Sequence, residues 1–364
     1  MPGVGVVGRG AEAFVVELCG ALARQGFEIT LFSRGPAPVR YRRISALPRD
    51  TRWVNRIYGA TRLGRKVFDT FFLDPLSLEW YTASLSAFPA LWRGRYDVVV
   101  MEGGLVGAWL TRLLRRLRGA AFVDIAHGLD PKWEGAFARQ KPDRVVVFTH
   151  AAAKMIRQRA PDARIAVIPH GVDLERFRPD VPAVSLDLPR PIVLTAGAVD
   201  AHKRMDLAVE AVARLDRGSL VVLGEGPEGE ALDRLAASRL GPGRYLRRTV
   251  PRDAMPGWYA AADCFTLPSR TESFGLTYLE ALACGLPCVA PDDDVRREVI
   301  GPAGRLCEVT DPAAYAAALS EVLGGSWGDR PDGIPRRQAG RFPVEATIRA
   351  YAELLRELRG GPER

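Results

Sequence analysis

The sequence lacks the features that mark membrane-spanning, secreted and zinc-binding proteins. No apolar run approaches the roughly 20 residues of a transmembrane helix. The opening MPGVG lacks the charged head and apolar stretch of a signal peptide. The five cysteines show neither zinc-ligand spacing nor the pattern of a disulfide framework. We therefore expect a cytoplasmic protein that depends on neither a zinc centre nor disulfide bonds.

Length and composition indicate a globular protein with two domains. The 364 residues exceed the roughly 250–300 at which single hydrophobic cores stop growing. Apolar residues make up 47% of the chain and charged residues 26%, which is enough apolar material for two cores. Residues 1–180 carry 28 lysines and arginines against 17 acids, whereas the remainder carries 23 against 26. This asymmetry is typical of a partner surface in the first half.

Short runs rich in valine and isoleucine alternate with segments of helical periodicity along the chain. The strand-like runs are 4–7, 28–32, 98–101, 121–124, 145–148, 166–168, 192–195, 220–223, 264–267 and 287–290. The helical patterns are 11–24, 105–117, 151–159, 205–215, 228–238, 274–283, 312–323 and 344–358. This alternation predicts β-α-β units on parallel sheets, an α/β fold class.

The alternation pauses once, over residues 174–191, where four prolines and no helical period indicate a linker. We therefore predict two Rossmann-like domains, residues 1–173 and 191–342, joined by a linker at 174–190. A C-terminal helix and tail, residues 343–364, follow them. A ligand cleft is expected at the carboxyl ends of the strands.

The first glycine-rich stretch, Gly3 to Gly8, matches G-x-G-x-x-G but has no strand before it. Because a dinucleotide-binding motif needs a strand before it and a helix after it, this context argues against such a site. Gly8, Arg9 and Gly10 are better placed, since they end a strand and open a helix. Their N–H groups could face a phosphate or a sugar hydroxyl, and a plain tight turn is the alternative.

The segment between residues 269 and 287 carries the most chemical information. Glu272 stands just ahead of a helix that we expect to begin near Ser273, and Glu280 stands two turns inside it. Eight residues span roughly 12 Å along a helix, which is comparable to the separation of the two sugars in a nucleotide sugar. Glu272 could hold a hexose and Glu280 the ribose, with the helix N-terminus facing the diphosphate. Taken singly, a capping carboxylate and a solvated helix residue are the alternatives.

This segment resembles the hallmark of the retaining glycosyltransferases of family 4, P-S-x-x-E-S-F-G-x-x-x-x-E-A-x-A-x-G-x-P, which includes the E-x7-E pair. Four further segments resemble family motifs in the right order, namely 124–128 (DIAHG), 168–173 (IPHGVD), 223–228 (LGEGPE) and 259–263 (YAAAD). The resemblance implies the GT-B architecture, two Rossmann-like domains that face each other across a cleft. We expect the C-terminal helix to return to the N-terminal domain.

The resemblance also implies roles for individual residues. Glu272, His127 and Lys203 match catalytic positions, with His127 facing the donor sugar and Lys203 neutralising the diphosphate. The residues implied to bind the donor are Glu280, Ser273, Phe274, Gly275, Leu276, Arg204, Gly224, Glu225, Val250, Gly8, Arg9 and Gly10. No cofactor is implied apart from the nucleotide-diphosphate sugar itself.

One departure from the family pattern concerns an arginine that usually precedes the lysine by five residues. Here Gly197 is followed by Ala198. Arg204 or Arg9 could replace the missing cation; otherwise the donor binds more weakly, or the chain binds sugars without efficient transfer. We expect Lys203 and the helix N-terminus to stabilise the leaving diphosphate without a metal. Asp292 to Asp294 could be a metal-binding D-x-D, but helix N-capping explains them as well.

These observations predict transfer of a hexosyl group from a UDP- or GDP-hexose to a hydroxyl acceptor, with retention of configuration. The alternatives are a sugar-nucleotide epimerase of the same architecture and a catalytically weak protein that binds sugar nucleotides or glycans. The acceptor is a lipid-linked glycan or a small-molecule hydroxyl, and we expect no nucleic-acid partner.

Residues 40–66 hold nine cations against one acid, Asp50. From Trp53 onward the apolar residues recur at spacings of three and four, so a helix there is amphipathic with a basic face. Such helices lie on anionic membranes, with each cation adding up to about 1 kcal/mol. Peripheral contact with an anionic membrane is therefore one hypothesis, and an ordinary core-packed helix with solvated arginines is the other.

Overall fold

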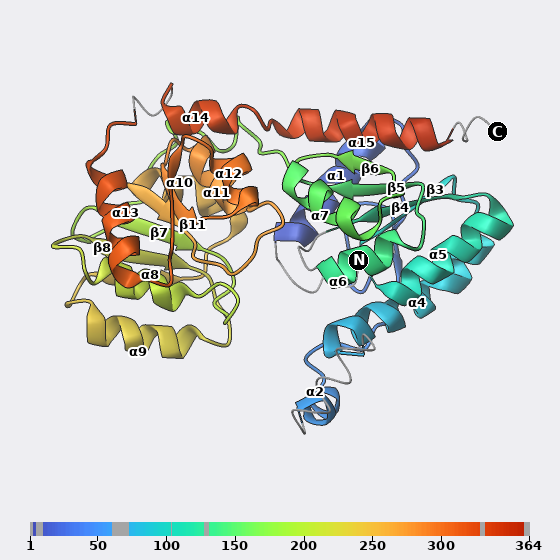
Figure 1. Ribbon diagram of the computed structural model, residues 1–364, viewed down its shortest axis with the longest axis horizontal. Helices are drawn as coiled ribbons and strands as arrows, with labels where there is room; N and C mark the ends of the chain where they lie inside the picture. The colour runs from blue at the N-terminus through green and yellow to red at the C-terminus, as the bar shows by residue number, and fades with distance from the viewer. Residues whose placement is uncertain are drawn as a thin grey trace. The chain divides into compact units, whose positions relative to one another are not determined.

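The computed structural model describes residues 3–4, 10–59, 73–102, 104–126, 131–327 and 332–359, which form two compact α/β units (Figure 1). The first unit comprises the described residues of Met1–Phe148, Ala152–Ile168 and Ile348–Arg364. The second comprises Thr149–Ala151 and the described residues of Pro169–Thr347. Because each unit has its own sheet and its own core, each is described by itself.

The first unit is built on a parallel sheet of order β3-β4-β5-β6. Its strands are β3 (Val98–Met101), β4 (Ala121–Ile125), β5 (Arg144–Val147) and β6 (Ile165–Val167). A separate parallel pair joins β1 (Leu31–Ser33) to β2 (Tyr41–Arg43). The predicted strand 28–32 is therefore found slightly later in the chain. The predicted strand 4–7 lies almost wholly outside the described residues.

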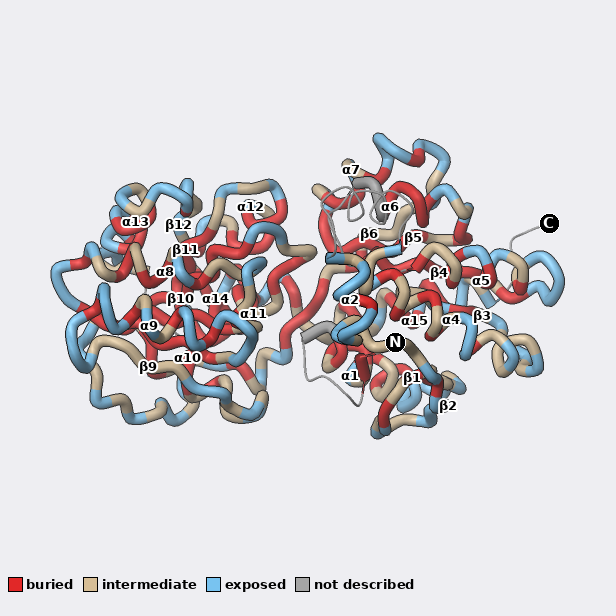
Figure 2. The backbone as a smooth tube through the Cα atoms, turned by 90° about the horizontal axis from the view of Figure 1, so that it is seen from below, coloured by how far each residue is buried: buried red, intermediate tan, exposed pale blue. Residues whose placement is uncertain are grey.

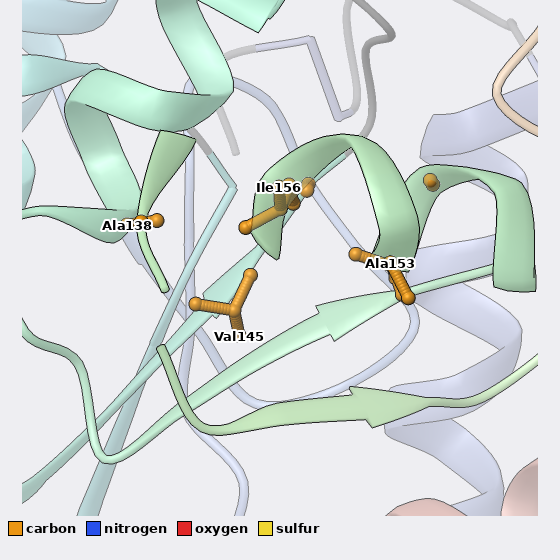
Figure 3. Close-up of a cluster of buried hydrophobic side chains, with 8 residues drawn as sticks. Ala138, Val145, Ala153 and Ile156 are labelled. Atoms are coloured by element: carbon orange, nitrogen blue, oxygen red, sulfur yellow. The ribbon is translucent and has the colours of Figure 1, made fainter. Parts of the chain in front are cut away.

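Within the described residues, the first unit contains six helices, and the last helix of the chain adds to them. They are α1 (Gly10–Arg24), α2 (Arg52–Gly59), α4 (Pro75–Arg93), α5 (Leu105–Arg118), α6 (Pro131–Ala138) and α7 (His150–Arg159). Helix α7 packs on β5 through small and branched side chains. Val145 and Ala153 are fully buried there, and Ile156 nearly so (Figure 3). Burying each such branched side chain contributes about 1.5–3 kcal/mol.

The second unit contains a six-stranded parallel sheet of order β12-β11-β10-β7-β8-β9. Its strands are β7 (Ile192–Ala196), β8 (Ser219–Leu223), β9 (Tyr245–Arg248), β10 (Cys264–Thr266), β11 (Cys288–Pro291) and β12 (Gly304–Cys307). The chain builds outward from β7 through β8 to β9, then returns to place β10 on the other side of β7. This reversal between β7 and β10 is the topological switch point at which doubly wound sheets bind ligands.

Seven helices and one 3-10 turn lie in the described part of the second unit. They are α8 (Met205–Val212), α9 (Gly229–Arg239), the turn η1 (Arg252–Ala254), α10 (Met255–Ala261), α11 (Leu276–Ala283), α12 (Asp294–Ile300), α13 (Pro312–Gly324) and α14 (Ile334–Ala339). All five residues of β7 and of β8 are buried, as expected for central parallel strands. The residues 174–191 contain no helix or strand.

The last helix, α15 (Val344–Arg359), starts in the second unit and continues in the first. At its start, Thr347 donates a 2.8 Å hydrogen bond to the Pro169 carbonyl. Further along, the ring of Tyr351 packs at 6.3 Å from that of Phe14, and Glu357 pairs with Arg144. The predicted return of the C-terminal helix to the N-terminal unit is therefore present.

The basic stretch at residues 40–66 does not form one continuous surface helix. Tyr41–Arg43 is the exposed strand β2, and helix α2 covers Arg52–Gly59. Between these two elements, Arg49 is not a free surface cation, because it pairs with the buried carboxylate of Glu79 at 2.6 Å. Arg62, Arg65 and Lys66 lie outside the described residues. Within the described ranges, no helix has the length and apolar character needed to cross a membrane.

Candidate functional site

The candidate site forms where β7 and β10 end, at the switch point of the second sheet. The loop after β7 runs from Gly197 to Arg204, and the loop after β10 runs from Leu267 to Gly275. The two loops touch, since the Arg270 N–H donates to the His202 carbonyl at 2.9 Å. Because both strands are parallel and adjacent, their carboxyl ends bring together residues about 70 positions apart in the chain.

The first loop presents Lys203 by a short turn that Asp200 stabilises. One carboxylate oxygen of Asp200 accepts the N–H groups of His202 and Lys203, each at 3.0 Å. Arg204 then adopts a left-handed conformation, φ 49°, and α8 follows. The Lys203 ammonium lies 2.6 Å from Oε1 of Glu272 in the second loop. A lysine predicted for the phosphates and a glutamate predicted for the sugar are thus brought into direct contact.

The second loop ends at Gly275, which adopts φ 89°. A Cβ atom there would lie 2.6 Å from Cδ2 of Tyr278, so both the conformation and the space require glycine. Helix α11 begins only after it, at Leu276, and its N-terminus has no side-chain cap among the described residues. The predicted start near Ser273 is therefore wrong, because the left-handed residue interrupts the helix geometry. Glu272 stands before the helix, and the 12 Å axial estimate does not apply to it.

The uncapped first turn of α11 suits an anion. The first N–H groups bonded within the helix are those of Tyr278 and Leu279, which both donate to the Gly275 carbonyl. The predicted residues Ser273 and Leu276 are partly exposed beside this turn, whereas Phe274 is buried. The Phe274 ring packs against His170 and Phe342, each at 5.6 Å between centroids. This packing holds the loop after β10 in place.

Glu280 is buried, with 3% of its surface exposed. Its Oε2 accepts a 3.0 Å hydrogen bond from the Tyr259 hydroxyl, and its Oε1 pairs with Arg252 at 3.1 Å. Burial and the neighbouring Glu280 raise the pKa of Tyr259 well above its ordinary value, so the hydroxyl remains a donor. The alternative of a solvated helix residue is wrong for Glu280. Tyr259 and Arg252 were missed as partners because only the fold brings them to it.

Gly224 follows β8 and lets two loops approach each other. A Cβ atom on Gly224 would lie 1.9 Å from the Gly197 carbonyl oxygen. The next residue, Glu225, accepts the Val199 N–H at 2.9 Å through its backbone carbonyl and is exposed at this edge. Val250 follows β9 and is partly buried. The loops after β7 and β8 are therefore packed closely against each other at the edge of the sheet where the site lies.

Arg204, predicted as a substitute for the missing arginine, is used to brace the second loop. Its Nε donates to the Pro268 carbonyl at 2.8 Å and its Nη2 to the Ser269 carbonyl at 3.4 Å. Burial, reinforced by Arg270 and Arg296, lowers its pKa. His127, Gly8 and Arg9 lie outside the described residues, and Gly10 is the first residue of α1.

The three aspartates that could resemble a metal site are engaged with arginines and a helix. Asp293 caps α12 by accepting the Arg296 N–H at 2.9 Å. Asp292 and Asp294 both pair with Arg297, each at 2.8 Å. Within the described ranges, no group of three or more histidines, cysteines or acids is arranged to hold a metal ion. N-capping is therefore observed for Asp293, and ion pairing with Arg297 for the other two.

Comparison with known proteins links both units to sugar transfer. Models described as "Glycosyltransferase Family 4" and "Glycosyl transferases group 1" match residues 8–176 and 190–324. A D-inositol 3-phosphate glycosyltransferase of Frankia alni is 32% identical, with 88% of this chain and 87% of that protein aligned. A GDP-mannose-dependent alpha-(1-6)-phosphatidylinositol monomannoside mannosyltransferase of Mycolicibacterium smegmatis is 30% identical over 63% of this chain and 68% of that protein.

A solved structure shows the same fold. It is a sucrose-phosphate synthase from Thermosynechococcus elongatus, which superposes with a TM-score of 0.78 at 22% identity. The superposition covers 96% of this chain and 94% of that one.

Proposed function

The chain belongs to glycosyltransferase family 4, with the GT-B fold, and acts on a nucleotide sugar; on this premise we propose that it is a retaining, metal-independent hexosyltransferase. The donor is a UDP- or GDP-hexose, and the acceptor is a hydroxyl group. The observation that carries the proposal is the contact between Lys203 and Glu272 beside the uncapped N-terminus of α11.

In the proposed donor complex, the first turn of α11 and the Lys203 ammonium hold the diphosphate. Preorganised cations and N–H groups stabilise the charge that develops on a leaving phosphate, which is the work a metal ion does in other enzymes. The carboxylate of Glu272 accepts from hydroxyls of the hexose. Glu280, fixed by Tyr259 and Arg252, accepts from the ribose hydroxyls.

The proposed reaction breaks the bond between the anomeric carbon and the diphosphate oxygen and forms a bond to the acceptor oxygen on the same face. The acceptor proton passes to the departing phosphate oxygen, so no side chain needs to change its protonation state. The anomeric carbon becomes cation-like during this exchange, and the nearby Glu272 carboxylate stabilises it. Family membership supports retention, because the E-x7-E motif is the hallmark of retaining enzymes of this family.

We propose a hydroxyl of a cyclic polyol as the acceptor. Support comes from the names of the relatives, one of which acts on D-inositol 3-phosphate and another on a phosphatidylinositol monomannoside. The first acceptor is soluble and the second is borne on a lipid. A lipid-borne acceptor agrees with the exposed basic and apolar side chains of α2, among them Trp53 and Ile57. Peripheral contact with an anionic membrane is part of this proposal.

The experiment that tests the proposal has two steps. Thermal unfolding in the presence of UDP-, GDP- and ADP-hexoses identifies the donor, since a ligand that binds the native state raises Tm by mass action. The selected donor is then incubated with inositol, inositol phosphate or phosphatidylinositol in excess chelator, and the products are analysed by NMR. An α-linked product from an α-linked donor is the expected result. Isomerised donor in the absence of acceptor would instead identify an epimerase.

A further inference from the structure

Arg296, in α12, is the largest fully buried side chain among the described residues. Removing a guanidinium from water is costly unless hydrogen bonds and a counter-charge satisfy it. Arg296 pairs with Asp293, and its guanidinium carbon lies 6.0 Å from the centre of the Tyr278 ring. These two contacts stabilise the charge. The Nη2 group of the guanidinium still needs partners of its own.

Nη2 contacts Ser269, which is also fully buried. Nη2 of Arg296 donates to both the backbone carbonyl and the hydroxyl oxygen of Ser269, each at 2.7 Å. Ser269 lies in the loop after β10, 27 positions earlier in the chain. Its hydroxyl oxygen is in turn 2.7 Å from Oε1 of Glu272. A buried cation and the candidate sugar-binding carboxylate are therefore joined through one hydroxyl.

The chemistry of the donors fixes the direction of these bonds. An arginine has N–H donors and no acceptor, so the Ser269 oxygen must accept from Arg296. The serine proton is then free to be donated to Oε1 of Glu272. Lys203 donates to the same oxygen at 2.6 Å. Oε2 of Glu272 receives no hydrogen bond from any residue that the structure describes, which leaves it for a ligand hydroxyl.

We propose that Arg296 is a positioning residue that, through Ser269, holds the Glu272 carboxylate with Oε2 presented to the transferred hexose. The role of Glu272 toward the hexose rests on the proposed function, whereas the relay of contacts belongs to the folded chain itself. The relay answers a geometric need of the reaction. When a diphosphate binds, Lys203 turns from Glu272 toward the phosphates, and Ser269 keeps the carboxylate in place.

This restraint on Glu272 matters more because the chain has Ala198 where the family usually has an arginine. Lys203 is then the one described side chain of the loop after β7 that contacts Glu272, and the same ammonium is required by the diphosphate. Charge-assisted hydrogen bonds are about twice as strong as neutral ones, so a serine that accepts from an arginine and donates to a carboxylate is a firm anchor. The relay thus takes over the restraint on Glu272 once the lysine is used elsewhere.

The kinetic test compares Ser269→Ala with Ser269→Thr in the full-length protein. Removing the hydroxyl should lower kcat roughly ten- to a hundredfold, the effect of losing one hydrogen bond to a charged group. KM for the donor and Kd for the nucleoside diphosphate should stay within about twofold of wild type. Threonine retains the hydroxyl and should restore most of the rate. Arg296→Met should reproduce the loss, while Arg297→Met, the exposed neighbour on the same helix, should not.

Two results would overturn the relay. The first is a wild-type kcat in Ser269→Ala, and the second is a fall in Tm that accounts for the lost activity through the unfolded fraction. A crystal structure of Ser269→Ala without ligand tests the relay independently of any donor. The proposal predicts that the Glu272 side chain changes rotamer or becomes disordered there. An unchanged Glu272 would refute the relay, whereas a changed Glu272 in a chain that transfers no sugar would refute only the proposed function.

Discussion

The Lys203 ammonium lies 2.6 Å from the Glu272 carboxylate, although 69 positions separate the two residues in the chain. They are neighbours because β7 and β10 are adjacent parallel strands that both end at this edge of the sheet. Each residue neutralises the other in the absence of a ligand. In the proposed donor complex, the diphosphate would take the place of Glu272 beside Lys203, and sugar hydroxyls would donate to Glu272.

Replacing Glu272 with Gln should depress turnover while nucleotide binding survives. The change removes the charge that stabilises the hexose end, at a cost of about 1.5–3 kcal/mol, or roughly ten- to a hundredfold in kcat. Transfer kinetics and calorimetric binding of the nucleoside diphosphate measure the two effects separately. Glu230→Gln, an exposed glutamate on α9, is the matched control. Wild-type kcat in Glu272→Gln would remove this residue from the site.

Replacing Lys203 with Met should lower both kcat and donor affinity, because in the proposed complex the ammonium contacts the diphosphate before and during bond cleavage. We expect a loss of at least tenfold, since a charged hydrogen bond to phosphate is among the stronger ones. Wild-type activity should persist in excess chelator if, as proposed, a fixed cation and a helix N-terminus do the work of a metal. Lys154→Met, on the exposed side of α7, controls for net charge. Full dependence on Mg²⁺ or Mn²⁺ would return Asp292 to Asp294 to consideration.

Replacing Glu280 with Gln should weaken nucleoside diphosphate binding more than it slows the chemical step. The carboxylate is buried between Tyr259 and Arg252, so it can bind the ribose without reorganisation. We expect Kd for the nucleoside diphosphate to rise about tenfold or more. Tyr259→Phe should give a smaller increase of the same kind. An unchanged Kd in both variants would contradict the assignment of this end of the site to the ribose.

Peripheral membrane contact should depend on helix α2. Helix α2 is mostly exposed (Figure 2), and Trp53 and Ile57, beside Arg52 and Arg56, are each more than half exposed. Liposome co-sedimentation should show binding to anionic vesicles that weakens at high salt, and little binding to neutral ones. The double variant Trp53→Ser, Ile57→Ser should abolish it. Trp109→Ser removes an equally exposed tryptophan from α5 and should not. Equal recovery in the supernatant with both vesicle types would favour a soluble acceptor.

Replacing Gly224 with Ala should destabilise the second unit. The added Cβ would lie 1.9 Å from the Gly197 carbonyl oxygen, and a backbone atom cannot move aside as a side chain can. Overpacking of this kind costs about 1–3 kcal/mol, which urea unfolding can resolve. Gly241→Ala is the control, because the nearest atom to its Cβ is a side-chain carbon at 3.8 Å. Equal unfolding midpoints would show that the two loops separate readily.

The sequence predicted the second unit well because its signals are local. Buried parallel strands are continuous apolar runs, and the E-x7-E motif places Glu272 and Glu280 within one short segment. The strands β2, β9 and β12 were missed because they are polar or exposed at sheet edges, as in Tyr41–Arg43. Their pairing depends on neighbours rather than on their own composition.

The environment of the two glutamates could not be derived in the same way. Arg296 stands next to Arg297 in the sequence, yet one is fully buried and the other is exposed. Arginines are seldom buried, so composition alone places both on the surface. Arg252 and Tyr259 contact Glu280 only because η1 and α10 lie beside α11. Contacts of this kind arise from topology, and no periodicity in the chain reports them.

Because α15 ends in the first unit, it determines which of the two units can complete its fold first during synthesis. The first unit needs residues from both ends of the chain, since Tyr351 packs on Phe14 and Glu357 pairs with Arg144. Chains fold during synthesis from the N-terminus at about 5–20 residues per second, usually one domain at a time. Here the second unit, which ends at Thr347 within α15, is synthesised before the part of that helix that belongs to the first unit. The unit that is translated first is therefore the last to be completed.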